Sequence, residues 1–340
     1  MIVIDGSAGE GGGQVLRTSL ALSLATGRPF RIEKIRTRRP KPGLMRQHLT
    51  SVQAAATVGR ARVEGDRLGS TALSFEPGEP QSGEYTFPVG TAGSATLVLQ
   101  TILPPLLTAA GPSRIAFAGG THNPWAPPFD FLDRVYLPCV RAMGPVVTAH
   151  LVRSGFYPAG GGRFEVVIEP CSTLGPFEIL HRGEIVGRSV RALIANLPRH
   201  IAEREIATAL TLLNWSSESG CIEEIRGASG PGNALMIEIR AGHAREILTG
   251  FGESGTPAEA VARRTVDDAR RYLAAGVPVG CHLADQLLPL LALAGGGAFR
   301  TLKLSRHALT NADVIRKFLD VTIDHRDEAR DVALVRISRK

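Results

Sequence analysis

The sequence predicts an α/β fold built from α+β two-layer sandwich units, with three repeated βαβαββ-like modules and a smaller inserted α/β domain. The repeat is predicted because a strand, a glycine-rich loop, a helix and a second strand open the chain, and this order returns later. The insertion is predicted because residues 183–276 follow a pattern of their own. With 340 residues, 44% of them hydrophobic, the chain can bury a sizeable core.

The first module begins with a strand at residues 1–5, followed by a glycine loop at 6–13, a helix over 14–26 and a strand over 30–35. A glycine and a proline that come directly after the helix end it. The apolar face of this helix is formed by Val15, Leu16, Leu20 and Leu24.

The glycine loop returns as GTAG at residues 90–93, which resembles GSAG at 6–9. Both loops stand the same number of positions before a glycine that ends an apolar helix, and a fainter third copy covers residues 280–297. Each module therefore holds about two helices and several strands, which is a two-layer sandwich. The second helix of each copy is expected at residues 44–58, 129–143 and 312–318.

These repeats predict one large domain, residues 1–182 and 277–340, divided into modules at about 1–80, 81–182 and 277–340. Residues 183–276 form the smaller inserted domain. Its helices carry many charged residues, as expected of an independently folded, solvated unit. Its expected elements are a strand at 190–196, a helix at 201–213, strands near 222 and 235, and a helix at 257–273.

Several function classes lack their motifs. The four cysteines form no CxxC pair, the nine histidines form no HExxH, and GxSxG does not occur, which disfavours zinc knuckles, redox dithiols, metalloproteases and serine esterases. The most apolar windows, 97–110 and 283–294, are too short and too interrupted to span a bilayer, so no membrane partner is expected. Because residues 1–6 resemble a first strand and not a signal peptide, we expect a cytoplasmic protein.

Positive charge is concentrated in residues 28–46. This segment holds eight basic residues and one acidic residue, so its net charge of +7 equals that of the whole chain. Such an excess favours an anionic partner, of which phosphate is the commonest, although a solvated arginine-rich loop has the same composition.

The loop at residues 6–14 reads GSAGEGGGQ and lies between a strand and a helix, where backbone N–H groups and the helix dipole favour an anion. It is not a Walker A loop, because Gly12 and Gly13 replace the required Lys and Ser or Thr, and Gln14 breaks the dinucleotide pattern. A tight turn that needs positive φ angles is an equally good interpretation.

Three polar residues are candidates for chemistry. Glu10 and Asp285 are placed where either carboxylate could hold a divalent ion beside a triphosphate, although isolated acids are more often helix caps or solvated charges. His307 could be a base or a nucleophile, but residue chemistry alone does not separate it from the other eight histidines.

Taken together, these segments resemble the RNA 3′-terminal phosphate cyclase family over nearly the whole chain. The family fold, as the resemblance implies it, has three repeated α/β units with a smaller domain inserted into the third. The motifs that carry the resemblance, in order, are GSAGEGGGQ with Arg17, RPKPGLMRQH at 39–48, the helix around Gln100, GGTHN at 119–123 with APP at 126–128, GFYPAGGG at 155–162, PRHIAERE at 198–205, HLADQ at 282–286, and His307 with Thr310 and Asn311.

The resemblance implies roles for residues at matching positions. His307 is expected to become adenylylated, Glu10 to bind a divalent metal, Mg or Mn, and the ring of His282 to stack on adenine. Cys281 departs from the family, because an acidic residue is expected there. ATP contacts are expected from Gln100, His282, Leu283, Ala284, Asp285 and Gln286. Phosphate contacts are expected from Arg17, Arg36, Arg39, Gln47 and His48.

The reaction implied by the resemblance is of the ligase class and belongs to RNA processing. An RNA 3′-terminal phosphate and ATP are converted to a 2′,3′-cyclic phosphate, AMP and pyrophosphate, through a histidine–AMP intermediate and an RNA–adenylate anhydride. ATP and RNA are thus the expected partners, with a homodimer as a further expectation. Two alternatives are a non-catalytic cyclase-like RNA-binding protein, which retention of His307 and the segment 282–286 disfavours, and an enolpyruvyl transferase, which shares the repeated architecture.

Overall fold

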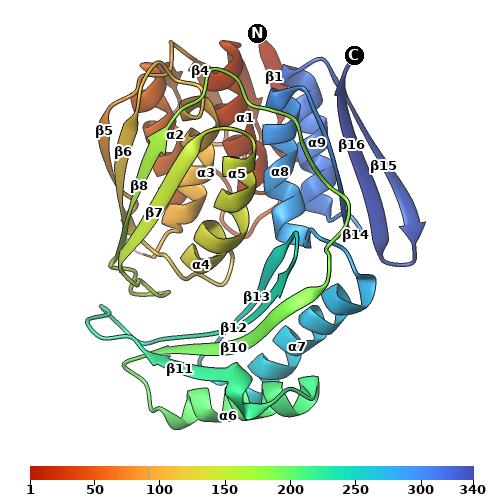
Figure 1. Ribbon diagram of the computed structural model, residues 1–340. Coiled ribbons are helices and arrows are strands. Elements are labelled where there is room, and N and C mark those ends of the chain that lie inside the picture. Colours follow the sequence, from red (N-terminus) through yellow and green to blue (C-terminus); the bar gives the residue numbers. More distant parts are fainter. Residues whose placement is uncertain (91) are drawn as a thin grey trace.

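The computed structural model describes residues 1–90 and 92–340, and it confirms an α/β fold with four four-stranded sheets among these residues. Three of the sheets surround a group of helices in the larger, upper part of Figure 1, and the fourth lies in the smaller, lower part. Thr91, which belongs to the second glycine loop, lies outside the described residues.

The first sheet has the order β1-β2-β4-β3. β1 runs parallel to β2, as expected when a helix connects two strands, and the other pairs are antiparallel. The strands are β1 (Ile2–Asp5), β2 (Phe30–Glu33), β3 (Arg62–Glu64) and β4 (Leu73–Glu76).

The second sheet repeats this arrangement in the order β5-β6-β8-β7, again with one parallel pair followed by antiparallel pairs. Its strands are β5 (Glu84–Pro88), β6 (Ser113–Gly119), β7 (Val146–Arg153) and β8 (Gly162–Glu169).

The third sheet has the order β15-β16-β14-β9, which is the same arrangement listed from its other edge. Its first strand, β9, lies before the lower part of the molecule in the chain and pairs in parallel with β14, with Phe177 opposite Gly297. Residues 177–179 lie in the predicted second module, 81–182, but pair with a strand of the predicted third module, 277–340. The strands are β9 (Phe177–Ile179), β14 (Gly296–Leu302), β15 (Val321–Ala329) and β16 (Val332–Arg339).

The fourth sheet differs in connectivity. Its order is β11-β10-β12-β13, so the first strand in the chain occupies an inner position and not the edge. Its strands are β10 (Ile185–Ala195), β11 (Gly220–Glu224), β12 (Gly232–Ala241) and β13 (Arg245–Phe251). Helices α6 (His200–Leu213) and α7 (Ala258–Ala275) pack on it, with a 3₁₀ turn η2 (Ser217–Ser219) between α6 and β11. The shared order of the other three sheets supports a division into three repeated modules and one insertion, which we retain as a proposal.

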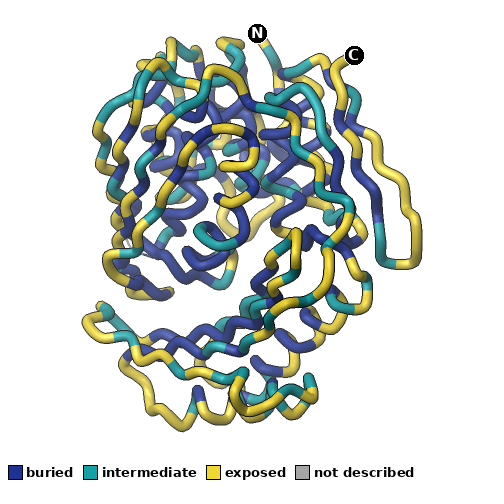
Figure 2. Tube along the Cα trace, in the orientation of Figure 1, coloured by how far each residue is buried: buried dark blue, intermediate teal, exposed yellow. Residues whose placement is uncertain are grey.

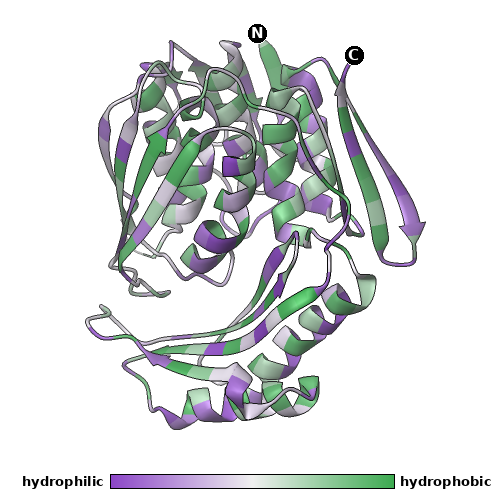
Figure 3. Cartoon of the chain, viewed as in Figure 1, coloured by the Kyte–Doolittle hydropathy of each residue, from purple (hydrophilic) through white to green (hydrophobic). Residues whose placement is uncertain are grey.

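The core of the upper part lies between its helices and sheets, where Figure 2 shows mostly buried chain. α1 (Gly13–Thr26) contacts four other helices, α2, α3, α8 and α9, and is buried on most of its surface, which agrees with its many apolar and small residues. Hydropathy follows the same division in Figure 3: α8 is largely hydrophobic, and α6 and the outer strand β15 carry many hydrophilic residues. The remaining helices here are α2 (Arg46–Gly59), α3 (Ala95–Leu106), α4 (Phe129–Phe131), α5 (Leu137–Ala142), α8 (Cys281–Ala294) and α9 (Arg306–Phe318).

Two expected helices differ from the observed ones. The segment 129–143 is helical, but the π-helical turn η1 (Leu132–Tyr136) separates α4 from α5. The last helix begins at Arg306 and not at residue 312, because the hydroxyl of Ser305 accepts a hydrogen bond from the N–H of Ala308 and caps it. His307 therefore lies in the first turn of a helix. Among the described residues, none of the helices combines the length and the apolar character needed to cross a membrane.

Candidate active site

The starts of α1, α8 and α9 lie side by side. The N–H of Glu10, in the glycine loop before α1, donates to the hydroxyl of Thr310 in α9 over 3.0 Å. The hydroxyl of Ser305, the cap of α9, donates to the carboxylate of Asp285 in the second turn of α8 over 2.9 Å. Since a helix start carries partial positive charge and free N–H groups, this arrangement favours bound anions.

The starts of α2 and α3 join the same region. The N–H of Ser94, the cap of α3, donates to the side-chain oxygen of Gln47 over 2.9 Å. Gly13, the first residue of α1, lies so close to the ring of His48 that an added Cβ would collide with it. Five helix starts from distant parts of the chain therefore face one region.

The glycine loop permits this close packing. Gly9 has a φ of +59°, and a Cβ there would overlap the side chain of Thr310. A Cβ on Gly12 would overlap the carboxylate of Glu10. The positive φ of Gly9 confirms the expected turn, and glycine also permits the close approach of Thr310 and Glu10, whereas anion binding by the loop stays a prediction.

His307 lies at the edge of this region with 49% of its side chain exposed, and its Nδ1 is 3.7 Å from Oε2 of Glu10. Partial burial lowers the pKa of His307 below 6.5, and the charges of Arg17 and Arg39 lower it further. The imidazole is thus neutral and accessible at neutral pH, which is the form that can act as a nucleophile.

The neighbouring cations have few anionic partners. Among the described residues, Arg17 forms no ion pair and donates to the side-chain oxygen of Gln14 over 2.9 Å, and burial lowers the pKa of Arg17 to about 10. Arg36 donates to two backbone carbonyls, and burial lowers its pKa as well. Burial and these two arginines lower the pKa of His48 to about 3. Only Arg39 forms an ion pair here among the described residues, with Glu10.

Glu10 is the carboxylate available to a divalent metal. The described residues contain no group of three or more His, Cys, Asp or Glu side chains that could hold one. However, the buried Oε2 of Glu10 has no hydrogen-bond partner in the described part of the chain. A single carboxylate fits Mg²⁺, which proteins often bind through one or two carboxylates, substrate phosphates and water.

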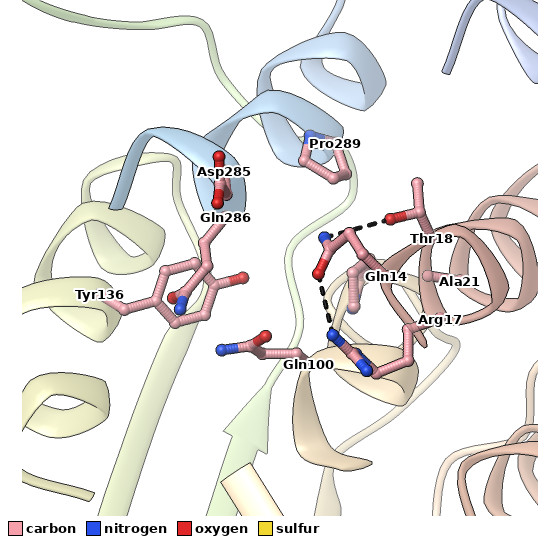
Figure 4. A pocket seen from close by; sticks show the side chains of 10 residues that line it. Gln14, Arg17, Thr18, Ala21, Gln100, Tyr136, Asp285, Gln286 and Pro289 are labelled. Atoms are coloured by element: carbon pink, nitrogen blue, oxygen red, sulfur yellow. Dashed lines mark hydrogen bonds between the residues drawn. The ribbon is translucent and has the colours of Figure 1, made fainter. Parts of the chain in front are cut away.

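A small cavity of about 30 Å³ lies between α1, α3 and α8 (Figure 4). Gln100 and Gln286 reach it from opposite sides, and the Oε1 atom of Gln286 is buried without a partner among the described residues. Burial raises the pKa of Asp285, which also lines this cavity, to about 7. Arg17 and Gln14 complete the polar wall, where Figure 4 shows their hydrogen bond.

A larger cavity of about 180 Å³ lies between the loop that contains Pro124 and the fourth sheet. Phe251 of β13 and Asp268 of α7 line it. Asp268 is close enough to His282 for each charge to shift the pKa of the other, although burial is the main cause that lowers the pKa of His282. His282 also contacts the edge of the Phe131 ring, with centroids 6.4 Å apart.

A family model described as RNA 3′-terminal phosphate cyclase matches residues 8–325 of the chain. The chain belongs to the RNA 3′-terminal phosphate cyclase family. The expected family and the expectation of a ligase-type enzyme are thus confirmed.

Several relatives carry the name "RNA 3'-terminal phosphate cyclase". The protein from Koribacter versatilis (strain Ellin345) is 52% identical over 328 residues, which are 96% of this chain and 92% of the relative. The protein from Salmonella agona (strain SL483) is 47% identical over 340 residues, 100% of this chain and 98% of the relative. That from Ralstonia nicotianae (strain ATCC BAA-1114 / GMI1000) is 49% identical over 337 residues, 99% and 96% of the two chains.

The structure brings most of the residues expected from the cyclase family to these helix starts. Glu10, Arg17, Arg39 and His307 gather at one point, and Gln47 and His48 join them from α2. The side chains of Leu283 and Ala284 belong to the hydrophobic core and line neither cavity, and contact of these two residues with ATP stays a prediction.

Some residues that line the two cavities were not identified from the sequence. Gln14 and Tyr136 line the small cavity, and Phe251 and Asp268 line the large one. Gln14 stands directly after the glycine loop, which is a local signal. Tyr136, Phe251 and Asp268 lie outside every motif, and only tertiary packing brings them to the two cavities.

Proposed function

We propose that the chain converts an RNA 3′-terminal phosphate to a 2′,3′-cyclic phosphate at the expense of ATP, through a covalent AMP adduct of His307. The observation that carries this proposal is a neutral, half-exposed His307 in the first turn of α9, surrounded by cations with few partners. Family membership supports the use of ATP and RNA.

In the first step, an imidazole nitrogen of His307 attacks the α-phosphorus of ATP. A P–N bond forms, and the bond to the bridging oxygen breaks and releases pyrophosphate. Nδ1 faces the carboxylate of Glu10, which favours a proton on Nδ1 and leaves the lone pair of Nε2 for the attack. Arg17 and Arg39 stabilise the charge that develops on the phosphate oxygens.

The adenine is proposed to lie in the larger cavity, within reach of the His282 ring, where stacking would hold it. Gln100, Asp285 and Gln286 would then face the ribose and α-phosphate from the smaller cavity. The metal, held by Glu10 and by phosphate oxygens, would supply charge neutralisation for the departing pyrophosphate.

In the second step, an oxygen of the RNA 3′-phosphate attacks the phosphorus of the histidine adduct. The P–N bond breaks, His307 is restored, and an RNA–adenylate anhydride forms. In the third step, the adjacent 2′-OH attacks the RNA phosphorus, and AMP leaves with the bridging oxygen. This ring closure is intramolecular, with an effective molarity on the order of 10⁵ M or more, so it needs little help from a base. DNA lacks the 2′-OH and cannot complete it.

Covalent labelling tests this proposal. Incubation with ATP labelled at the α-phosphate and a divalent metal is expected to label the wild type and not His307→Ala. His325→Ala, which removes an exposed histidine of β15 outside the five helix starts, is the matched control and is expected to label normally. Equal labelling of His307→Ala would contradict the assignment, and an unlabelled wild type that still binds RNA would favour a non-catalytic RNA-binding protein.

The cytoplasmic location and the homodimer stay predictions. Cell fractionation and light scattering would test them.

A further inference from the structure

Two large aromatic side chains are exposed next to each other on the upper part of the molecule. Trp125 is 71% exposed and Tyr157 is 48% exposed, and their rings meet edge to face with centroids 4.8 Å apart. A folded protein gains nothing from leaving such surface in water, since aromatic rings bury 150–250 Å² each when packed. The exposure of the Trp125–Tyr157 pair therefore indicates that a ligand binds to these two rings.

The two loops that carry the pair are firmly anchored. His122, shortly before Trp125 in the chain, and Phe156, directly before Tyr157, are buried and stacked on each other, with ring centroids 5.1 Å apart. The side chain of Asn123 is buried and donates to the carbonyl of Ala92. Trp125 thus projects from a fixed, proline-rich loop, and a ligand would lose little free energy in ordering it.

The anchored loop is continuous with the candidate active site. The hydroxyl of Thr96, in the first turn of α3, donates to the carbonyl of Pro127 over 3.0 Å. Two residues before it, the N–H of Ser94 donates to the side-chain oxygen of Gln47, whose neighbour His48 packs against the start of α1. These contacts, in which Ser94 and Thr96 are buried, tie the loop of Trp125 to the helix starts of the candidate active site.

The charge around the pair suits a nucleic acid. Arg153 at the end of β7 donates to the carbonyl of Gly161, in the same turn as Tyr157, over 2.6 Å. It forms no ion pair within the described part of the chain, so its charge is available to a backbone phosphate.

We propose that the Trp125–Tyr157 pair is a stacking platform for a nucleobase of the RNA substrate, upstream of its 3′-phosphate. This inference rests on the proposed function. Exposed aromatic rings beside an arginine, on a loop anchored to a candidate phosphate site, are typical of single-strand binding surfaces, where stacking adds affinity with little sequence preference. The adenine of ATP is not the proposed occupant, because neither Trp125 nor Tyr157 lines the large cavity in which the adenine is proposed to lie.

A series of RNA 3′-phosphate oligonucleotides with one abasic nucleotide, moved stepwise from the 3′ end, tests the platform. With the wild type, one position is expected to raise the KM for RNA about 5- to 150-fold, the range measured for loss of one stacked base. Trp125→Ala is expected to raise the KM for the intact RNA by a similar factor and to be insensitive to the abasic position. Trp125→Phe, which keeps a stacking ring, is expected to retain most of both properties.

Labelling of His307 by ATP in the absence of RNA separates this inference from the proposed function. If Trp125→Ala labels at the wild-type rate and shows the expected RNA effects, the inference is supported. A slower labelling with an unchanged KM for RNA would assign Trp125 to ATP and overturn it. No labelling of the wild type would instead overturn the proposed function.

Fluorescence gives a direct readout of contact. Trp215 is the other tryptophan of the chain, and its ring packs on Arg188 away from the site residues, so Trp215→Phe leaves Trp125 as the single reporter. A 3′-phosphate RNA is expected to quench this emission, and the oligonucleotide with the sensitive abasic position is expected to quench it less. Unchanged emission at saturating RNA, or a change of oligomeric state in Trp125→Ala, would overturn the platform.

Discussion

Two histidines of this chain each face a carboxylate and an arginine, yet their surroundings are opposite. His122 is fully buried, and its ring bonds to Asp130 at 3.0 Å on one side and to Thr121 at 2.8 Å on the other. Asp130 also pairs with Arg191 of β10, which links the upper part of the molecule to the fourth sheet. Every polar group of this linking cluster is satisfied by another.

The His307 cluster contains the same residue types, but some of its polar groups lack hydrogen-bond or ion-pair partners among the described residues. His307 is half exposed, one oxygen of Glu10 has no hydrogen-bond partner among the described groups, and Arg17 is a buried cation with only an amide oxygen as partner. Residue type alone therefore does not distinguish a structural cluster from a reactive one. Exposure and incomplete pairing do, since uncompensated groups lower stability unless a ligand binds them.

The largest expected difference between the clusters follows from removal of each histidine. His307→Ala is expected to lose the AMP adduct and to lower cyclisation by at least about 10³-fold, with the free energy of unfolding nearly unchanged. His122→Ala is expected to destabilise the fold by about 3 kcal/mol, because it removes a buried ring and its hydrogen bonds. Folded His122→Ala is expected to form the adduct. Denaturant unfolding and single-turnover labelling measure the two effects, and stable but unlabelled His122→Ala would reverse the assignment.

Removal of an arginine from each cluster is expected to change stability in opposite directions. Arg17→Met is expected to lower the adenylylation rate about 10²- to 10³-fold and to raise stability slightly, because it removes a buried cation without a carboxylate partner. Arg191→Met is expected to cost about 3 kcal/mol, because Asp130 keeps its buried charge. Thermal unfolding with and without ATP measures this contrast. A destabilised Arg17→Met would show that Arg17 is part of the folding framework.

Glu10 provides a test of intermediate size. Glu10→Gln is expected to raise the Mg²⁺ concentration for half-maximal adenylylation about tenfold, since one charged ligand is lost. It also releases Arg39, so Arg39→Ala serves as the control and is expected to leave the Mg²⁺ dependence unchanged while it slows the reaction. An identical Mg²⁺ titration of Glu10→Gln and wild type would remove Glu10 from the metal site.

The smallest expected effect is a shift in pH dependence. Only neutral His307 can attack, so the single-turnover rate is expected to rise with pH and to be half-maximal below pH 6.5, because burial and the two arginines lower the pKa of His307. Arg39→Ala removes one of these charges and is expected to move the midpoint upward. Burial raises the pKa of Asp285 to about 7, so its titration could also change the rate in this pH range. Asp285→Asn removes this titration and serves as the control. A midpoint unaffected by Arg39→Ala would place that arginine outside the electrostatic reach of His307.

The local elements of the fold could be predicted because they depend on neighbours in the chain. The parallel strands around α1, the glycine that ends this helix and the glycine loop before it all follow from periodicity and from allowed backbone angles. The start of α9 was placed too late because the cap Ser305 is a weak local signal, which the contact with Asp285 strengthens only in the folded chain.

The candidate site could be predicted only through resemblance to the cyclase family. No spacing rule joins Glu10 to Thr310, which are 300 positions apart and hydrogen bonded. Likewise, no pattern shows that His122 is enclosed whereas His307 is open, since both stand in polar sequence next to threonine or alanine.

The sequence by itself determined the α/β class, most helices and strands, the concentration of charge in residues 28–46 and the family. Only tertiary packing places β9 in the third sheet, brings five helix starts together and leaves the cations there with few anionic partners among the described residues. This division arises because propensity and periodicity depend on residues close together in the chain. In contrast, pKa shifts, cavities and exposure depend on groups that only packing brings within a few ångströms of each other.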